Sequence, residues 1–227
     1  MNYLEKFETD LISTPAGNLS ITFLGHGSLL MGIQGKNVYI DVFGEVADYS
    51  KLPKADFILL THEHFDHLDP KALAAIRTDN TVVVCTEACK QQLQGGIVMH
   101  NGDKQILSGI PVEAVPAYNL VHKRPSGDPF HPKGSGNGYI LTIGGKRIYI
   151  AGDTENIPEM KSLKDIDIAF LPMNLPYTMT PEMVADAARA FHPRILYPYH
   201  YGDTNLALLG ELLAQEKAIE IRIRKMA

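Results

Sequence analysis

The stretch Asp56–His67, with the sequence DFILLTHEHFDH, guides the interpretation of the rest of the chain. Its first half, DFILLT, is an apolar run typical of a strand that is buried on both faces. Its second half has the spacing H-x-H-x-D-H, and residues i and i+2 of an extended chain point the same way. His62 and His64 can therefore present two imidazoles to one metal ion. Asp66 and His67 follow where the chain bends toward the next helix, and they can bind a second ion.

Two later segments have the same architecture, in which a strand ends next to a residue able to bind metal. The run RIYIA, Arg147–Ala151, is followed by GDT, which contains Asp153, and the run ILYPY, Ile195–Tyr199, is followed by His200. Open α/β layers place their sites at the carboxyl ends of strands, so we expect three such ends to meet. Asp153, with its two oxygens, could bridge both ions. Imidazole and carboxylate ligands suit zinc, manganese or iron.

Short apolar, β-branched runs separated by Gly, Pro and Asp predict a chain rich in strands. Helix starts are expected after Asp69, Thr86 and Thr180, which are favourable N-cap residues. Strand-rich blocks bracketed by helices indicate two sheets packed face to face with helices outside. The expected strands are Leu19–Leu24, Ser28–Ile33, Asn37–Val42, Asp56–Thr61, Thr81–Cys85, Ile110–Tyr118, Gly138–Ile143, Arg147–Ala151, Ile166–Leu171, Ile195–Tyr199 and Ile219–Ile223. The expected helices are Pro70–Ile76, Glu87–Leu93, Pro181–Phe191 and Leu206–Gln215.

Composition limits the classes of protein that the chain can belong to. Of its 227 residues, 45% are apolar and 21% charged, as in an average globular domain, so we expect residues 1–227 to form one domain. A net charge of −5 makes nucleic-acid binding an unlikely role, since that depends on neutralising phosphates with Lys and Arg. The absence of a recognisable signal peptide or transmembrane run leads us to expect a cytoplasmic protein without a membrane partner. Cys85 and Cys89 are expected to be buried or semi-buried thiols.

The order HEHFDH, then GDT at Gly152–Thr154, then PYH at Pro198–His200 resembles the metallo-β-lactamase superfamily, over roughly residues 20 to 200. The resemblance implies an α+β fold, a four-layer αβ/βα sandwich with two mixed β-sheets face to face and helices outside. It also implies a dinuclear metal site at one edge of the sheets. The implied ligands are His62, His64 and a third histidine on the first ion, Asp66, His67 and His200 on the second, and Asp153 as a bridge.

The sequence does not decide which residue is the third ligand of the first metal ion. In the family it follows the strand that corresponds to Ile110–Tyr118, but here Asn119 stands in that position. His122 and His131 both lie in the irregular stretch 119–137. This stretch is longer than a simple connection between two strands needs to be, which indicates a functional loop. His131 is the favoured ligand, because the glycines that follow it would let the backbone approach a metal closely. His122, Asn119 and an open position are the alternatives.

Three further residues are candidates for contact with the substrate. His26, in LGHGS, resembles a stretch beside the site in the lactonase and phospholipase subgroup of this family. Lys133 could meet an anionic substrate, although an isolated loop lysine is usually solvated. Tyr177, in NLPYTM, could line the pocket or lie on the surface.

These residues predict a metal-dependent hydrolase that cleaves an ester-type bond, a lactone or a phosphodiester, in a small anionic substrate. Two divalent ions, zinc before manganese or iron, would lower the pKa of a water molecule from 15.7 toward about 7 and polarise the group that it attacks. Asp66 is the expected catalytic residue, because it could orient the resulting hydroxide and later pass a proton to the leaving group.

Two rival functions share this pattern. Diiron oxidoreductases of the same fold carry H-x-E-x-D-H, whereas His64 stands here in place of the glutamate. A non-catalytic metal or ligand sensor would bind metal without turnover. Small soluble enzymes are often homo-oligomers, so we expect a homo-oligomer such as a dimer.

Overall fold

The computed structural model describes residues 3–227, and two seven-stranded sheets form its centre. The first sheet contains β1 (Thr9–Thr14), β2 (Gly17–Gly25), β3 (Ser28–Ile33), β4 (Lys36–Ile40), β5 (Phe57–Leu59), β6 (Val82–Cys85) and β7 (Ile97–Val98), in that order. The second contains, in the spatial order β14 to β8, the strands β8 (Lys104–Leu107), β9 (Ile110–Ala117), β10 (Gly136–Ile143), β11 (Lys146–Ile150), β12 (Ile168–Pro172), β13 (Ile195–Tyr199) and β14 (Glu220–Ile221).

Each sheet is antiparallel in its first half and parallel in its second. Strands β1 to β4 pair antiparallel and β4 to β7 parallel. Strands β8 to β11 pair antiparallel and β11 to β14 parallel. The two halves of the chain therefore have the same topology, and the parallel strands of both sheets can deliver residues to one common edge.

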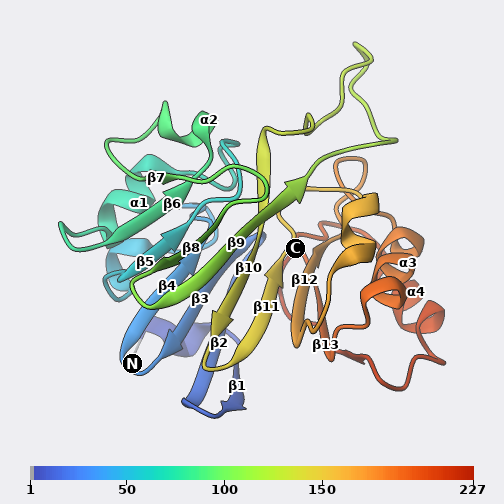
Figure 1. The fold of residues 1–227 in the computed structure, drawn as a ribbon, viewed down its shortest axis with the longest axis horizontal. Helices are drawn as coiled ribbons and strands as arrows, with labels where there is room; N and C mark the ends of the chain where they lie inside the picture. Colours follow the sequence, from blue (N-terminus) through green and yellow to red (C-terminus); the bar gives the residue numbers. More distant parts are fainter. Residues whose placement is uncertain (1–2) are drawn as a thin grey trace.

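Helices cover the outer faces of both sheets (Figure 1). They are α1 (Pro70–Ile76), α2 (Glu87–Lys90), α3 (Pro181–Phe191) and α4 (Leu206–Leu212), with short 3-10 helices η1 (Tyr3–Lys6), η2 (Tyr49–Lys51) and η3 (Pro158–Ser162). The Asp69 carboxylate caps α1 by accepting hydrogen bonds from the backbone N–H groups of Lys71 and Ala72, at 2.8 and 3.2 Å. None of the helices in residues 3–227 is long and apolar enough to span a bilayer.

The main core lies between the two sheets. Phe23 of β2 packs against Tyr197 of β13 with ring centroids 5.1 Å apart, and Tyr197 stacks on Phe170 of β12 at 5.0 Å. A second apolar cluster lies outside the first sheet, beneath α1 and α2, and contains the free thiols of Cys85 and Cys89, both buried as expected. The expected α+β sandwich of two mixed sheets with helices outside is confirmed.

Several expected boundaries were wrong for local reasons. Strands β1, β7 and β8 were not expected, because they are short or have alternating exposed residues, such as Leu11 (67% exposed) and Ile106 (75%), and so lack a clear apolar run. The helix expected to reach Leu93 ends at Lys90, and the chain then reverses through Gly95–Gly96, which both have positive φ. The last two expected elements also end early, at Leu212 and at Ile221.

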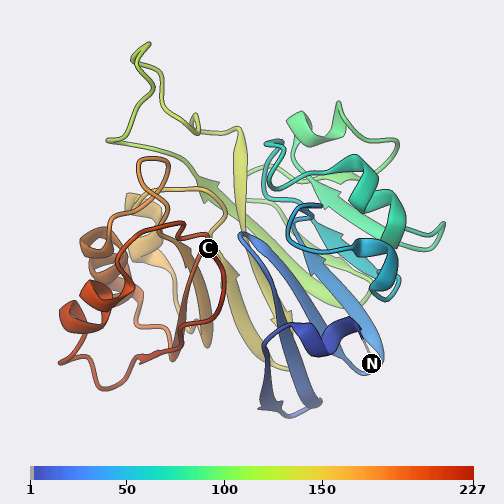
Figure 2. The same ribbon diagram turned by 180° about the vertical axis from the view of Figure 1, so that it is seen from behind.

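Residues 118–135, between β9 and β10, contain neither helix nor strand, and we call them the arm. The arm projects away from the body of the molecule in both views (Figures 1 and 2). Its tip folds back on itself through an isolated bridge between Lys123 and Pro129. The expectation of one long irregular segment is therefore confirmed.

Candidate metal centre

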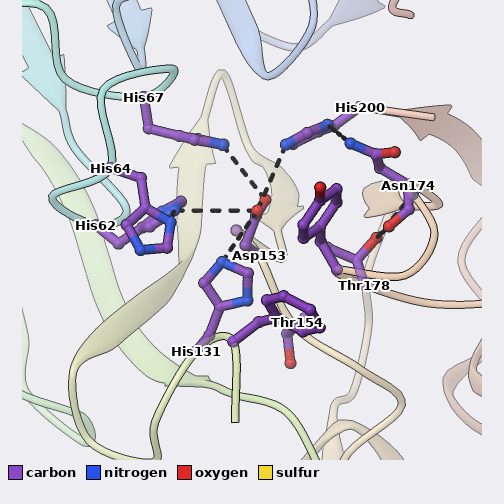
Figure 3. A network of polar contacts seen from close by, with 12 residues as sticks. His62, His64, His67, His131, Asp153, Thr154, Asn174, Thr178 and His200 are labelled. Atoms are coloured by element: carbon purple, nitrogen blue, oxygen red, sulfur yellow. Dashed lines mark hydrogen bonds and ion pairs between the residues drawn. The ribbon is translucent and has the colours of Figure 1, made fainter. Parts of the chain in front are cut away.

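Side chains from four segments of the chain meet at one edge of the two sheets, at the carboxyl ends of parallel strands (Figure 3). The structure thus brings together seven of the residues singled out in the sequence. The segment after β5 supplies His62, His64, Asp66 and His67, the segment after β11 supplies Asp153, β13 leads to His200, and the arm supplies His131.

Asp153 lies at the centre of this cluster, and its side chain is 4% exposed. Four histidines direct Nε2 toward its carboxylate. The distances are 3.3 Å from His131, 3.4 Å from His67, 3.4 Å from His200 and 4.0 Å from His62. A carboxylate in this position can contact ions on both sides of it, which is the geometry expected of a bridging ligand.

The candidate ligand atoms fall into overlapping groups around Asp153. One is formed by His62, His64 and His131, whose ligand atoms all lie within 4.8 Å of one another. A second is formed by His26, Asp66, His67 and His200, with the same limit. A third group, His62, His67 and Asp153, overlaps both. The first two groups contain the histidines and the aspartate that the resemblance implies for each ion, and the second contains His26 in addition.

Unpaired buried atoms test whether the cluster suits metal ions. In residues 3–227, the Nε2 atoms of His67 and His200 and Oδ1 of Asp153 are buried and have no hydrogen-bond partner. Buried polar atoms in native proteins are nearly always paired. Three such atoms facing one another, all nitrogen or carboxylate oxygen, are the donor set that zinc, manganese or iron would satisfy. The residues therefore fit divalent metal ions.

Asp41, which the sequence did not reveal, orients two of these histidines. Its buried carboxylate accepts a hydrogen bond from Nδ1 of His67 at 2.7 Å. It also accepts bonds from the backbone N–H of Thr61 (2.7 Å) and from the Thr61 hydroxyl (2.8 Å). That hydroxyl oxygen lies 3.0 Å from Nδ1 of His62, from which it can accept a hydrogen bond. Both rings are thereby held by Nδ1 with Nε2 directed toward Asp153, as outer partners of metal-bound histidines do.

The position of Asp41 resembles that of the other site residues, which is the signal that could have found it. It directly follows β4, as Asp153 and His200 follow their strands, yet the sequence placed it inside an expected strand. Its φ is +47°, and those of His26 and His200 are +54° and +45°. Positive φ is costly for residues with a Cβ and tends to occur where a site demands it.

The structure brings His131 to the cluster, and not His122 or Asn119. The Asn119 side-chain oxygen accepts hydrogen bonds from the backbone N–H and from Nδ1 of His131, each at 2.8 Å, so Nε2 of His131 faces Asp153. Nδ1 of His122 instead lies 2.7 Å from a carboxylate oxygen of Glu155. Asn119 thus orients His131 through hydrogen bonds. It stands where the family pattern places a metal-binding histidine.

His26 contacts the expected catalytic carboxylate. Its Nε2 lies 2.9 Å from Oδ2 of Asp66, and its ring centroid is 3.7 Å from that of His200. Burial would raise the pKa of Asp66, but the hydrogen bond from His26 and the nearby His67 outweigh burial and lower that pKa to about 2. Asp66 is therefore an anion at neutral pH.

The histidines of the metal-free cluster differ in their affinity for protons. Burial lowers the pKa of His62, His64 and His200 below the usual 6.5. Burial also acts on His67, but the carboxylates of Asp153 and then Asp41 outweigh it and raise its pKa to about 9. A metal ion at His67 must therefore displace a proton.

A cavity of about 350 Å³ opens beside the cluster. It is lined by His64, Phe65, Asp66, Arg124, Phe130, His131, Asp153, Asn174, Tyr177 and His200. Tyr177 thus lies where substrate contact was expected. The structure does not bring Lys133 there, because its ammonium group forms an ion pair with Glu159 at 2.9 Å and lies over the Tyr118 ring.

Comparisons with known proteins agree with this geometry. A family model described as "Beta-lactamase superfamily domain" matches residues 20–200. Proteins named "UPF0173 metal-dependent hydrolase" from Pelotomaculum thermopropionicum and Thermococcus onnurineus are each 31% identical, over 195 and 196 residues, covering 81% of this chain and 84% of each relative.

Solved structures share the fold. A crystal structure from Parabacteroides distasonis, provisionally named a metal-dependent hydrolase, has a TM-score of 0.92 at 50% identity, covering 97% of this chain and 100% of that one. A metallo hydrolase from Ignicoccus hospitalis has a TM-score of 0.74 at 23% identity, covering 91% and 95% of the two chains. The chain is therefore a member of the beta-lactamase superfamily and belongs to its UPF0173 metal-dependent hydrolase family.

Proposed function

We propose that this protein is a hydrolase that uses two divalent metal ions, zinc before manganese or iron, to cleave an ester-type bond in a small anionic substrate. The observation that carries the proposal is the set of unpaired buried atoms on His67, His200 and Asp153, which face one another beside an open cavity. The relatives named metal-dependent hydrolases support the general reaction class. A lactone and a phosphodiester are both compatible with this site.

Each ion would have its own set of ligands. His62, His64 and His131 would hold the first, Asp66, His67 and His200 the second, and Asp153 would contact both. Such ions, when bound, supply Lewis acidity and lower the pKa of water.

Asp66 is the residue to which we assign catalysis. Its surroundings indicate whether it mainly orients the attacking water or mainly passes a proton to the leaving group. The His26 imidazole fixes one of its oxygens, and the pKa of Asp66 is about 2. A carboxylate with so low a pKa stays ionised, and so can bind a metal ion or accept a hydrogen bond, but it holds a proton weakly. We therefore assign it primarily to orienting the attacking water, with proton transfer to the leaving group as a brief, second step.

The experiment compares metal-loaded and chelator-treated protein on lactones, thioesters and bis-p-nitrophenyl phosphate. We expect turnover by the metal-loaded form alone. Hydrolysis of a lactone would identify lactones as the substrate class, and hydrolysis of bis-p-nitrophenyl phosphate would identify phosphodiesters. Asp66→Ala should abolish turnover while the circular dichroism spectrum stays unchanged. Asp79→Ala, which changes an exposed aspartate, is the matched control and should keep full activity. A normal rate for Asp66→Ala would refute the role assigned to Asp66.

A further inference from the structure

The cavity beside the cluster has an apolar wall that the metal ligands do not use. Phe130 and Tyr177 contact each other edge to face, with centroids 5.0 Å apart, and so join the arm to the loop that follows β12. Phe65 also lines the cavity and is 74% exposed, which is unusual for so large an apolar ring. Its ring packs edge to face on Phe43 at 5.9 Å. A cavity of about 350 Å³ with such a lining suits a small molecule that has an apolar part.

The charges of the lining residues indicate what else that molecule carries. Arg124 is the one Lys or Arg among the residues that line the cavity. The acidic residues in the lining are Asp66 and Asp153, and the proposed function assigns both to the metal ions. No ion pair joins Arg124 to a carboxylate within the part of the chain that the structure describes, residues 3–227. Its positive charge therefore remains available to a ligand.

Arg124 is also held in position. Its guanidinium donates a hydrogen bond to the carbonyl of Phe130 at 3.3 Å and lies 5.2 Å from the centre of the Phe130 ring. Its backbone N–H donates to the carbonyl of Asp128 at 2.7 Å, and its carbonyl accepts from Gly127 at 2.9 Å, which closes the tip of the arm. These contacts hold the exposed side chain against Phe130, and they reduce the entropy lost when a ligand binds.

The base of the arm is fastened as well. The buried carboxylate of Glu155 accepts hydrogen bonds from the backbone N–H groups of Leu120, Val121 and His122, at 2.6, 2.6 and 2.7 Å. Glu155 is two residues from Asp153, so the arm is tied directly to the segment that carries the central carboxylate. Arg124 therefore belongs to a unit with fixed connections to the metal cluster.

We propose that Arg124 is the residue that recognises an anionic group of the substrate, a carboxylate or a phosphate placed away from the bond that is cleaved. The apolar part of the substrate lies against Phe65, Phe130 and Tyr177, and the bond to be cleaved faces Asp66 and Asp153. This inference rests on the proposed function for the position of the cleaved bond. The recognition of the anion by Arg124 can be tested without turnover.

The first test measures binding to the metal-loaded protein by calorimetry. The probes are 4-phenylbutyrate, 4-phenylbutyl phosphate and the neutral 4-phenylbutanol. Arg124→Gln is expected to raise the Kd of at least one anionic probe by about 10- to 100-fold, the range of a charge-assisted hydrogen-bonded pair, and to leave the neutral probe unchanged. Lys123→Gln, at an exposed neighbour that does not line the cavity, is the control of equal charge and should change neither.

The second test uses turnover. With mono-4-nitrophenyl glutarate, an ester that carries a separate carboxylate, Arg124→Gln should raise KM and leave kcat unchanged, whereas both constants for neutral 4-nitrophenyl butyrate should stay the same. A protein that hydrolyses neither ester but shows the expected loss of anion binding would contradict the proposed function alone.

The binding results decide the proposal. A larger loss for the phosphate probe identifies phosphate as the recognised group, and a larger loss for the butyrate identifies carboxylate. Unchanged binding of both anions by Arg124→Gln would show that Arg124 does not recognise the anionic group, and it would overturn the proposal. An equal loss in Lys123→Gln would overturn it too, because the effect would then come from net charge.

Discussion

Replacing Asp41 with asparagine should weaken metal binding although Asp41 itself contacts no metal ion. The Asp41 carboxylate accepts three hydrogen bonds, from the backbone and the hydroxyl of Thr61 and from Nδ1 of His67. An asparagine has one oxygen, so its NH2 group must face at least one of these donors. If it faces His67, the ring can adapt only by moving its proton to Nε2, and the atom meant for a metal then loses its free electron pair.

The structure indicates the size of this effect. Loss of an outer partner of a metal-bound histidine typically costs about 10- to 100-fold in metal affinity. We expect a loss in that range for the ion at His67, and a smaller loss for the ion at His62, which Asp41 orients only indirectly through the Thr61 hydroxyl. The metal-free protein should lose about 1–3 kcal/mol of unfolding free energy, the cost of leaving a buried donor unpaired.

Metal affinity is measured by competition with a chromophoric zinc chelator, and stability by urea unfolding of chelator-treated protein. Asp10→Asn is the matched control, because the Asp10 carboxylate is also mostly buried and binds Tyr197, Arg222 and Arg224 instead of the cluster. It should lower stability and leave metal affinity unchanged. Equal zinc affinity in Asp41→Asn and the unmutated protein would refute the orienting role.

Three further predictions concern the arm, pH and the third histidine. Glu155→Ala should lower the unfolding free energy by about 2–4 kcal/mol and speed hydrogen exchange at residues 120–122, since it removes the acceptor of three backbone N–H groups. In metal-free protein, the unfolding free energy measured in urea at several pH values should be highest near pH 6.5. It falls below 6.5, where the histidines with a lowered pKa take up protons only in the unfolded chain, and it falls above 6.5, where the contribution of His67 decreases steadily and is gone by about pH 9. His131→Ala should remove one bound ion per chain in elemental analysis, whereas His122→Ala should retain both.

The fold was predictable where residue patterns act locally. The helix Pro70–Ile76 followed from Asp69 and its proline, and the strand before His62 followed from an apolar run. Edge strands such as β1 were missed, because their residues are half exposed and the pairing depends on a partner strand rather than on apolar periodicity.

The candidate metal ligands were predictable, because they follow the ends of strands. The residues that orient these ligands or fasten the arm were not predictable. His62, His64 and Asp153 occur in compact motifs, and the cluster contains them all. Asp41 and Glu155 act through hydrogen bonds to segments distant in the sequence. Asp41 shares its place at a strand end with the expected ligands, whereas nothing local distinguishes Glu155 from an ordinary turn or capping residue. The same is true of Arg124, whose position beside the cavity depends on how the arm folds.

The number of metal ions bound per chain tests the central claim most directly. Purified protein is dialysed with zinc, freed of excess metal and analysed by inductively coupled plasma mass spectrometry, with anomalous diffraction to place the ions. We predict two ions per chain on either side of Asp153, one beside His62, His64 and His131 and the other beside Asp66, His67 and His200. A protein that retains no zinc, manganese or iron, or holds ions only at other residues, would contradict the account.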